Sequence, residues 1–241
     1  MSIQQMLLGA VSAAGGGGGT GGEKSVLFAG DEWLKADDSD LNIGTGDFTV
    51  EFWARWDSNA GQNILDCAFE SRSGGGSTSD GFMVARWTYS GHQNKVSVYM
   101  AGWLVEESGT TALNTWNHWA VVRNSSTIHL YKDGTSVDSV SNSTSFSNTT
   151  WYIGSLQNEA TGVSGGDNAM RGYITNFRFT KTAVYTSNFT APTSPLSALS
   201  DTKLFCCAQD STTDPVTETI GDVSLTTPSG NSPSVDGTSP F

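Results

Sequence analysis

Basic residues are scarce in this sequence. Its 241 residues include 12 lysines and arginines against 24 aspartates and glutamates, so the formal net charge at pH 7 is −12. An acidic surface repels the phosphates of nucleic acids and the headgroups of anionic lipids. We therefore expect no nucleic-acid partner.

Long apolar runs and cysteines are also lacking. No stretch approaches the roughly 20 apolar residues that cross a bilayer, so no membrane span is expected. The positively charged start of a secretory signal peptide is missing too, because the first basic residue is Lys24. Three cysteines are too few for a disulfide framework in a domain of this size, and we expect buried thiols at Cys67, Cys206 and Cys207.

Helical periodicity is nearly absent, and alternation of apolar and polar residues takes its place. In residues 48–56, FTVEFWARW, every second residue is apolar, and the opposite face still carries Trp53. Such alternation, with Ser, Thr, Gly and Asn between the runs, predicts an all-β protein. Further strands are expected at residues 25–30, 63–70, 81–87, 95–100, 116–124, 127–133, 151–155, 172–180 and 203–208, with a short one near 222–227.

The sequence also predicts one tight turn and the limits of the domains. Asp133-Gly134 suits a two-residue type I′ hairpin, since both central residues of that turn need positive φ angles. We expect residues 1–22 to form an extended arm, residues 23–200 a sandwich, and residues 201–241 a C-terminal strand and an irregular segment that packs on the sandwich.

Three segments, residues 47–56, 116–134 and 170–196, resemble the laminin G-like branch of the concanavalin A-like lectin/glucanase superfamily. The resemblance implies a two-sheet antiparallel jelly-roll sandwich, in agreement with the alternation. The third segment, with the KLFCCA strand and the SPF end that follow it, is also similar to proteins of tailed, especially marine, bacteriophages.

Glucanases of this superfamily would imply a cluster of carboxylates on one strand face, which a retaining hydrolase uses as acid and nucleophile. The nearest candidates are Asp66 and Glu70, but Ile64 stands where the first glutamate should be. The three histidines, His92, His118 and His129, have no nucleophile motif nearby. We therefore expect no catalytic residues and no enzymatic activity.

An acidic segment at residues 30–40 suggests calcium, a cation that prefers oxygen ligands. Its spacing fits no EF-hand, and a solvated acidic loop is the interpretation that we favour over a calcium site. The candidate ligands are Asp31, Asp37, Asp38 and Asp40, and no other cofactor is expected.

A lectin-like fold also implies a sugar site. Trp87, Tyr89 and Trp103 lie at or beyond predicted strand ends, where their rings could stack on sugars beside His92 and Asn94. Because most of the eight tryptophans of an all-β domain must fill the core, this assignment rests mainly on analogy with the fold.

The N-terminal 22 residues combine an apolar tip with a polyglycine stretch. Such a tip stays unburied unless another protein shelters it, and glycine lets the backbone pass through a crowded channel. We expect docking on other virion proteins, capsid or tail, through Ile3, Met6, Leu7 and Leu8.

These observations favour a non-enzymatic structural protein on the virion surface of a tailed phage, serving decoration, stabilisation or adhesion to host glycans, and present as a homo-oligomer. The first alternative is a freestanding carbohydrate-binding lectin. The weaker alternative is a divergent glycoside hydrolase.

Overall fold

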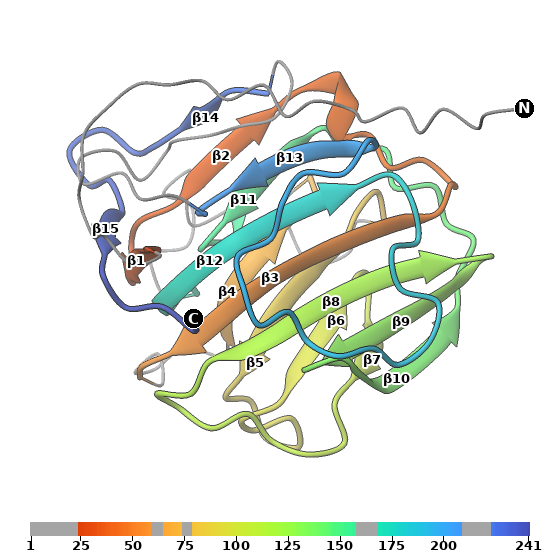
Figure 1. Cartoon of the computed structure of the whole chain (residues 1–241), viewed down its shortest axis with the longest axis horizontal. Coiled ribbons are helices and arrows are strands. Elements are labelled where there is room, and N and C mark those ends of the chain that lie inside the picture. The colour runs from red at the N-terminus through yellow and green to blue at the C-terminus, as the bar shows by residue number, and fades with distance from the viewer. Residues whose placement is uncertain (1–23, 59–64, 74–78, 158–167, 209–222) are drawn as a thin grey trace, which may run out of the picture.

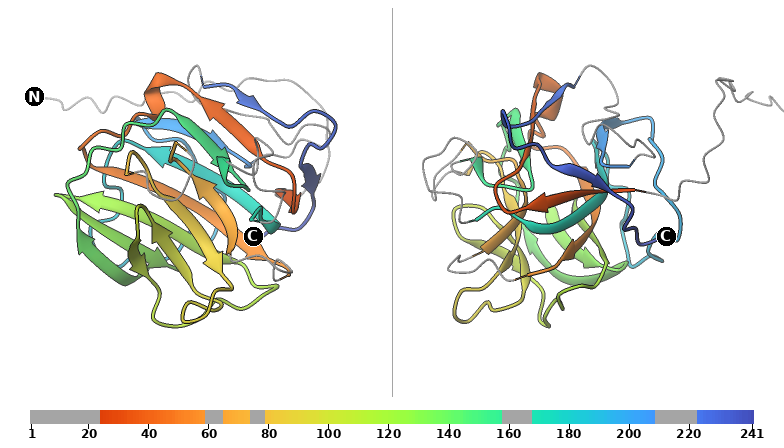
Figure 2. Two further views of the ribbon diagram at one scale, coloured as in Figure 1. Left: turned by 180° about the vertical axis from the view of Figure 1, so that it is seen from behind. Right: turned by 90° about the vertical axis from the view of Figure 1, so that its left-hand side faces the viewer.

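The computed structural model describes residues 24–58, 65–73, 79–157, 168–208 and 223–241. Two β-sheets lie face to face, as Figure 1 and the edge-on view in Figure 2 show. All paired strands in the described part run antiparallel. The predicted all-β, two-sheet antiparallel sandwich is confirmed.

The first sheet, sheet A, has the order β10-β9-β8-β3-β12-β1-β15, with β13 paired to β12. Its strands are β1 (Ser25–Ala29), β3 (Phe48–Trp56), β8 (Asn117–Asn124), β9 (Thr127–Lys132), β10 (Thr135–Ser141), β12 (Arg171–Thr180), β13 (Thr202–Cys206) and β15 (Ser234–Asp236).

The second sheet, sheet B, has the order β14-β2-β11-β4-β5-β6-β7. Its strands are β2 (Leu34–Asp37), β4 (Leu65–Glu70), β5 (Met83–Trp87), β6 (Val96–Tyr99), β7 (Trp103–Glu106), β11 (Thr150–Ile153) and β14 (Leu225–Thr226). A 3₁₀ helix, η1 (Ser39–Leu41), follows β2, and no helix in the described part is long and apolar enough to cross a membrane.

Aromatic side chains fill the space between the sheets. Trp56, Trp119 and Trp151 are completely buried, and Phe69 contacts Trp151 with ring centroids 5.0 Å apart. Rings of this size bury large apolar areas, which is the dominant favourable contribution to folding. The three cysteines are free and buried, as predicted.

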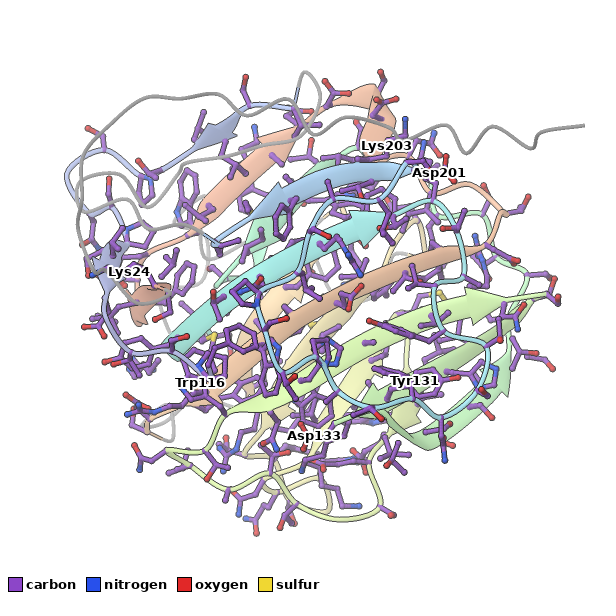
Figure 3. The ribbon with its side chains drawn as sticks, in the orientation of Figure 1. Lys24, Trp116, Tyr131, Asp133, Asp201 and Lys203 are labelled. Carbon is purple, nitrogen blue, oxygen red and sulfur yellow. The ribbon has the colours of Figure 1, made fainter. Side chains whose placement is uncertain are left out.

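The outer face of sheet A is covered by residues 181–201, which we call the strap (Figure 1). Its residues Ala183, Tyr185 and Phe189 pack on a small apolar cluster of Ala120, Val122 and Tyr131. Figure 3 shows Tyr131 beside the strap. The strap therefore acts as a third layer over part of this face.

Most expected strands are present, and β3 has the predicted limits. The hairpin is confirmed, since Asp133 and Gly134 have φ angles of 49° and 79° and join β9 to β10. The expectation of a solvated acidic loop is wrong over β2, where Leu34 and Ala36 are buried. In β2, Lys35 and Asp37 alternate with Leu34 and Ala36, but a strand of four residues is too short for this alternation to be recognised in the sequence. Strands β7 and β15 were not predicted for the same reason.

Candidate functional site

The described surface exposes few large apolar side chains. The exposed ones are Tyr89, Trp103, Leu199 and Phe241, at 55%, 40%, 41% and 38%. Tyr89 follows β5 and Trp103 begins β7, two strands at one end of sheet B, which the left view of Figure 2 shows from behind. Exposed aromatic rings from neighbouring strands are the kind of surface feature that marks a binding site.

Strand register brings the aromatic side chains to one face. Tyr99 on β6 pairs with Trp103 on β7 and with Met83 on β5, so these side chains point outward from the sandwich. Trp87 contacts Trp103 at 4.3 Å between ring centroids, and Tyr99 contacts Trp103 at 5.5 Å. Trp87 is only 5% exposed, so it supports Trp103 from below instead of facing solvent.

The loop between β5 and β6 positions two further rings. Asn94 adopts a left-handed φ of 62°, donates its backbone N–H to the Trp87 carbonyl at 2.8 Å, and accepts at 2.6 Å from the buried Arg86 through its side-chain oxygen. Asn94, expected beside the site as a polar contact, is therefore an anchor of the loop. This anchoring holds Tyr89 and His92 next to β7.

His92 links the aromatic rings to a charged pair. Its ring lies parallel to that of Trp103, with centroids 3.6 Å apart and 7° between planes, and Tyr89 follows at 6.3 Å and 18°. His92 Nδ1 lies 2.5 Å from Glu106 Oε2, and Lys95 Nζ donates to Glu106 Oε1 at 3.0 Å. We call this group the aromatic edge; it comprises Trp87, Tyr89, His92, Lys95, Tyr99, Trp103 and Glu106.

A flat apolar surface with a carboxylate and an ammonium group at its rim suits a ring-shaped ligand that has an apolar face and hydroxyl groups around it. The structure brings the three predicted residues, Trp87, Tyr89 and Trp103, together. It adds Tyr99, Lys95 and Glu106, which the sequence analysis missed. Tyr99 could have been found from its alternation with Ser97 on a predicted strand, whereas Glu106 lies on a strand too short to recognise.

Three of the four aspartates proposed for calcium, Asp37, Asp38 and Asp40, have other partners. Asp37 lies 3.4 Å from Lys35, Asp40 lies 3.7 Å from Lys203 on β13, and Asp38 accepts the Asp40 backbone N–H at 2.7 Å at the start of η1. Figure 3 labels Lys203. Within the described residues, no three His, Cys, Asp or Glu side chains are arranged to hold a metal ion, so the carboxylate cluster expected at Asp31, Asp37, Asp38 and Asp40 does not form.

The two carboxylates of β4 face opposite sides of sheet B. A bulge between Cys67 and Phe69 shifts the register, so that Asp66 pairs with Arg86 and points inward while Glu70 pairs with Met83 and points outward. Glu70 is buried and bonded to Arg72 at 2.6 Å. Burial raises the pKa of Glu70. The two side chains cannot act together on one sugar.

A second group of ionisable residues lies under the strap on sheet A. Glu51 accepts from His118 Nε2 at 3.1 Å, from Arg178 Nε at 3.0 Å and from the Tyr185 hydroxyl at 2.8 Å. Burial would raise the pKa of Glu51, but the bonds from His118 and Arg178 hold it below its ordinary value. Since Glu51 and His118 are completely buried, this group stabilises the fold.

The predicted docking residues Ile3, Met6, Leu7 and Leu8 lie outside the described residues. The docking prediction therefore stays a prediction.

The antiparallel sandwich, with aromatic rings gathered at one sheet edge, defines a lectin-like β-sandwich domain. Residues 28–187 match the family model of the laminin G-like group in the concanavalin A-like lectin/glucanases superfamily. The chain belongs to this family. No curated protein matches the sequence.

Solved structures with the same fold have distant sequences. A protein of Bacteroides ovatus proposed to bind carbohydrate has a TM-score of 0.65 and 13% identity over 89% of this chain and 59% of its own. A heptameric pentraxin of Limulus polyphemus has a TM-score of 0.51 and 15% identity over 68% of this chain and 78% of its own. Domains LG4-5 of mouse laminin alpha1 have a TM-score of 0.48 and 16% identity over 71% and 47%. The chain thus spans less than two thirds of the Bacteroides protein.

Proposed function

We propose that this chain is a non-catalytic carbohydrate-binding domain whose sugar site is the aromatic edge. The observation that carries the proposal is that two exposed rings, Tyr89 and Trp103, both stack with His92 beside the polar groups of Lys95 and Glu106. Membership of a lectin family and the fold shared with the Bacteroides protein support it. Membership of the family supports a carbohydrate as the ligand, and the exposed rings support the aromatic edge as its binding site.

The non-catalytic part of the proposal rests on the carboxylates. A retaining hydrolase needs two carboxyl groups on the same side of the bond that it cleaves. Asp66 and Glu70, the pair that came nearest to that motif, lie on opposite faces of β4 and are held by Arg86 and Arg72. This arrangement disfavours a divergent glycoside hydrolase.

Binding to an array of oligosaccharides tests the proposal. Trp103→Ala and Tyr89→Ala each remove an exposed ring, and we expect affinity for the bound glycan to fall about tenfold or more. Leu199→Ala, which removes an equally exposed apolar side chain from the strap, is the matched control and should bind normally. An array without any bound glycan, or full binding by Trp103→Ala, would contradict the proposal.

The role on a phage virion is a separate proposal that rests on the sequence. Its support is the apolar and glycine-rich composition of residues 1–22 and the phage-like segment 170–196. We propose that this arm attaches an oligomer of the chain to capsid or tail, leaving the sandwich outside to meet host glycans. Full-length protein should copurify with particles, and a variant without residues 1–22 should not; copurification of the truncated variant would refute attachment through the arm.

A further inference from the structure

His92 occupies a face of Trp103. With parallel rings 3.6 Å apart, the two side chains are in van der Waals contact and leave no room for a third ring between them. Trp87 and Tyr99 contact Trp103 from the sheet, at 4.3 Å and 5.5 Å between centroids. A flat ligand that stacks on the same face of Trp103 must therefore take the place of His92.

His92 also occupies Glu106 Oε2, the hydrogen-bond acceptor that such a ligand would need. Its Nδ1 atom lies 2.5 Å from Glu106 Oε2, while the other carboxylate oxygen is bonded to Lys95. When the imidazole leaves, Glu106 Oε2 becomes free to accept a hydrogen bond. A sugar hydroxyl can donate that bond.

We propose that a neutral sugar ring binds by replacing His92: it stacks on Trp103 and donates a hydroxyl hydrogen bond to Glu106 Oε2. This inference rests on the proposed function and adds its mode of binding and its class of sugar. Neutral sugars are favoured because an acidic sugar would bring its carboxylate to Glu106, whose charge Lys95 already pairs with. The net charge of −12 also repels acidic sugars.

Replacement makes the His92 side chain a competitor of the sugar. The imidazole is held by its contact with the Trp103 ring and by Glu106 Oε2, and both contacts must break before the sugar binds. Because His92 and Glu106 are partly exposed, this competition is weak, and loss of the imidazole should raise sugar affinity about two- to fivefold.

The experiment compares glycans and variants. An array carrying neutral glucans, mannans and galactans beside uronate- and sialate-bearing oligosaccharides identifies the best probe, whose Kd is measured by calorimetry. We expect neutral probes to bind, and His92→Ala to bind them more tightly than the wild type does. His129→Ala removes a partly exposed histidine that stacks on Tyr131 and should behave as the wild type.

Failure of this inference can be told from failure of the proposed function. Equal or weaker binding by His92→Ala, or a preference for acidic sugars, overturns the replacement of His92, while loss of binding in Trp103→Ala would still support the sugar site. An array with no binder overturns both.

Discussion

At the scale of single residues, Glu51 links several elements on the strap side of sheet A. It joins β3, β8, β12 and the strap, because its partners His118, Arg178 and Tyr185 come from the other three elements. A buried carboxylate is costly unless it is bonded in this way. Removing its charge would leave Arg178, only 4% exposed, without its ionic partner.

We expect Glu51→Gln to lower the free energy of unfolding by about 3–5 kcal/mol, the cost of breaking a buried ion pair. Urea unfolding followed by tryptophan fluorescence measures the change. Asp37→Asn removes a carboxylate from an exposed pair with Lys35 and should cost less than about 1 kcal/mol. Equal effects of the two substitutions would contradict the assigned role of Glu51.

Tyr185 gives a prediction for alkaline pH. Burial, followed by the charge of Glu51, raises the pKa of Tyr185 well above the ordinary value near 10. Above pH 10 the unfolded chain therefore loses this proton while the folded chain keeps it, so the contribution to stability is complete below pH 10 and declines as the pH rises. Wild-type protein should lose more stability between pH 9 and pH 11 than Tyr185→Phe does, as measured by urea unfolding. Parallel losses would show that Tyr185 does not hold its proton in the folded state.

Among the elements, the β9-β10 hairpin and the strap depend on each other. The Gly134 carbonyl accepts the Phe189 backbone N–H at 2.8 Å, and a Cβ atom at position 134 would collide with the Phe189 carbonyl oxygen. The φ angle of 79° at Gly134 is itself unfavourable for other residues. The turn thus needs glycine for its backbone and for the approach of the strap.

Gly134→Ala should destabilise the protein by about 1–3 kcal/mol and loosen the strap. Thermal unfolding measures the first effect, and the rate of proteolytic cleavage within residues 181–201 measures the second. Gly46→Ala is the control, because a Cβ atom there meets nothing within 4 Å. Cleavage of the strap at the same rate in both variants would contradict the coupling.

At the scale of the whole molecule, the two outer faces differ. The strap covers part of sheet A, where Glu51 and His118 are buried, whereas Tyr89 and Trp103 at the β5-β7 end of sheet B are exposed. Figure 2 shows this end of sheet B from behind. Binding is therefore proposed on the outer side of sheet B, opposite the strap.

This arrangement predicts binding without turnover. Incubation with β-glucans should release no reducing ends above the blank, because Asp66 and Glu70 point to opposite faces. Release of reducing ends that is lost in Glu70→Gln would contradict the non-catalytic proposal. Normal glycan binding by the same preparation would show that it is folded.

Part of the fold and of the site could be predicted. Residues 48–56 are recognisable as a strand because nine alternating residues give a clear period of two. The strands β2 and β7 have four residues each, which is too few to show that period. Trp87, Tyr89 and Trp103 were selected for their positions near strand ends. Packing between segments places Trp87 beneath Trp103 and brings Asn94 into hydrogen-bond contact with Arg86.

Alternation and turn chemistry act between near neighbours in the chain, so the sequence by itself determined the β class, the strand limits of β3 and the Asp133-Gly134 hairpin. The stack of His92 on Trp103, the opposite directions of Asp66 and Glu70, and the choice of the face that the strap covers were decided only by the tertiary structure. The physical reason is that strand pairing, one bulge and the closing of a long loop bring together groups that no local pattern connects.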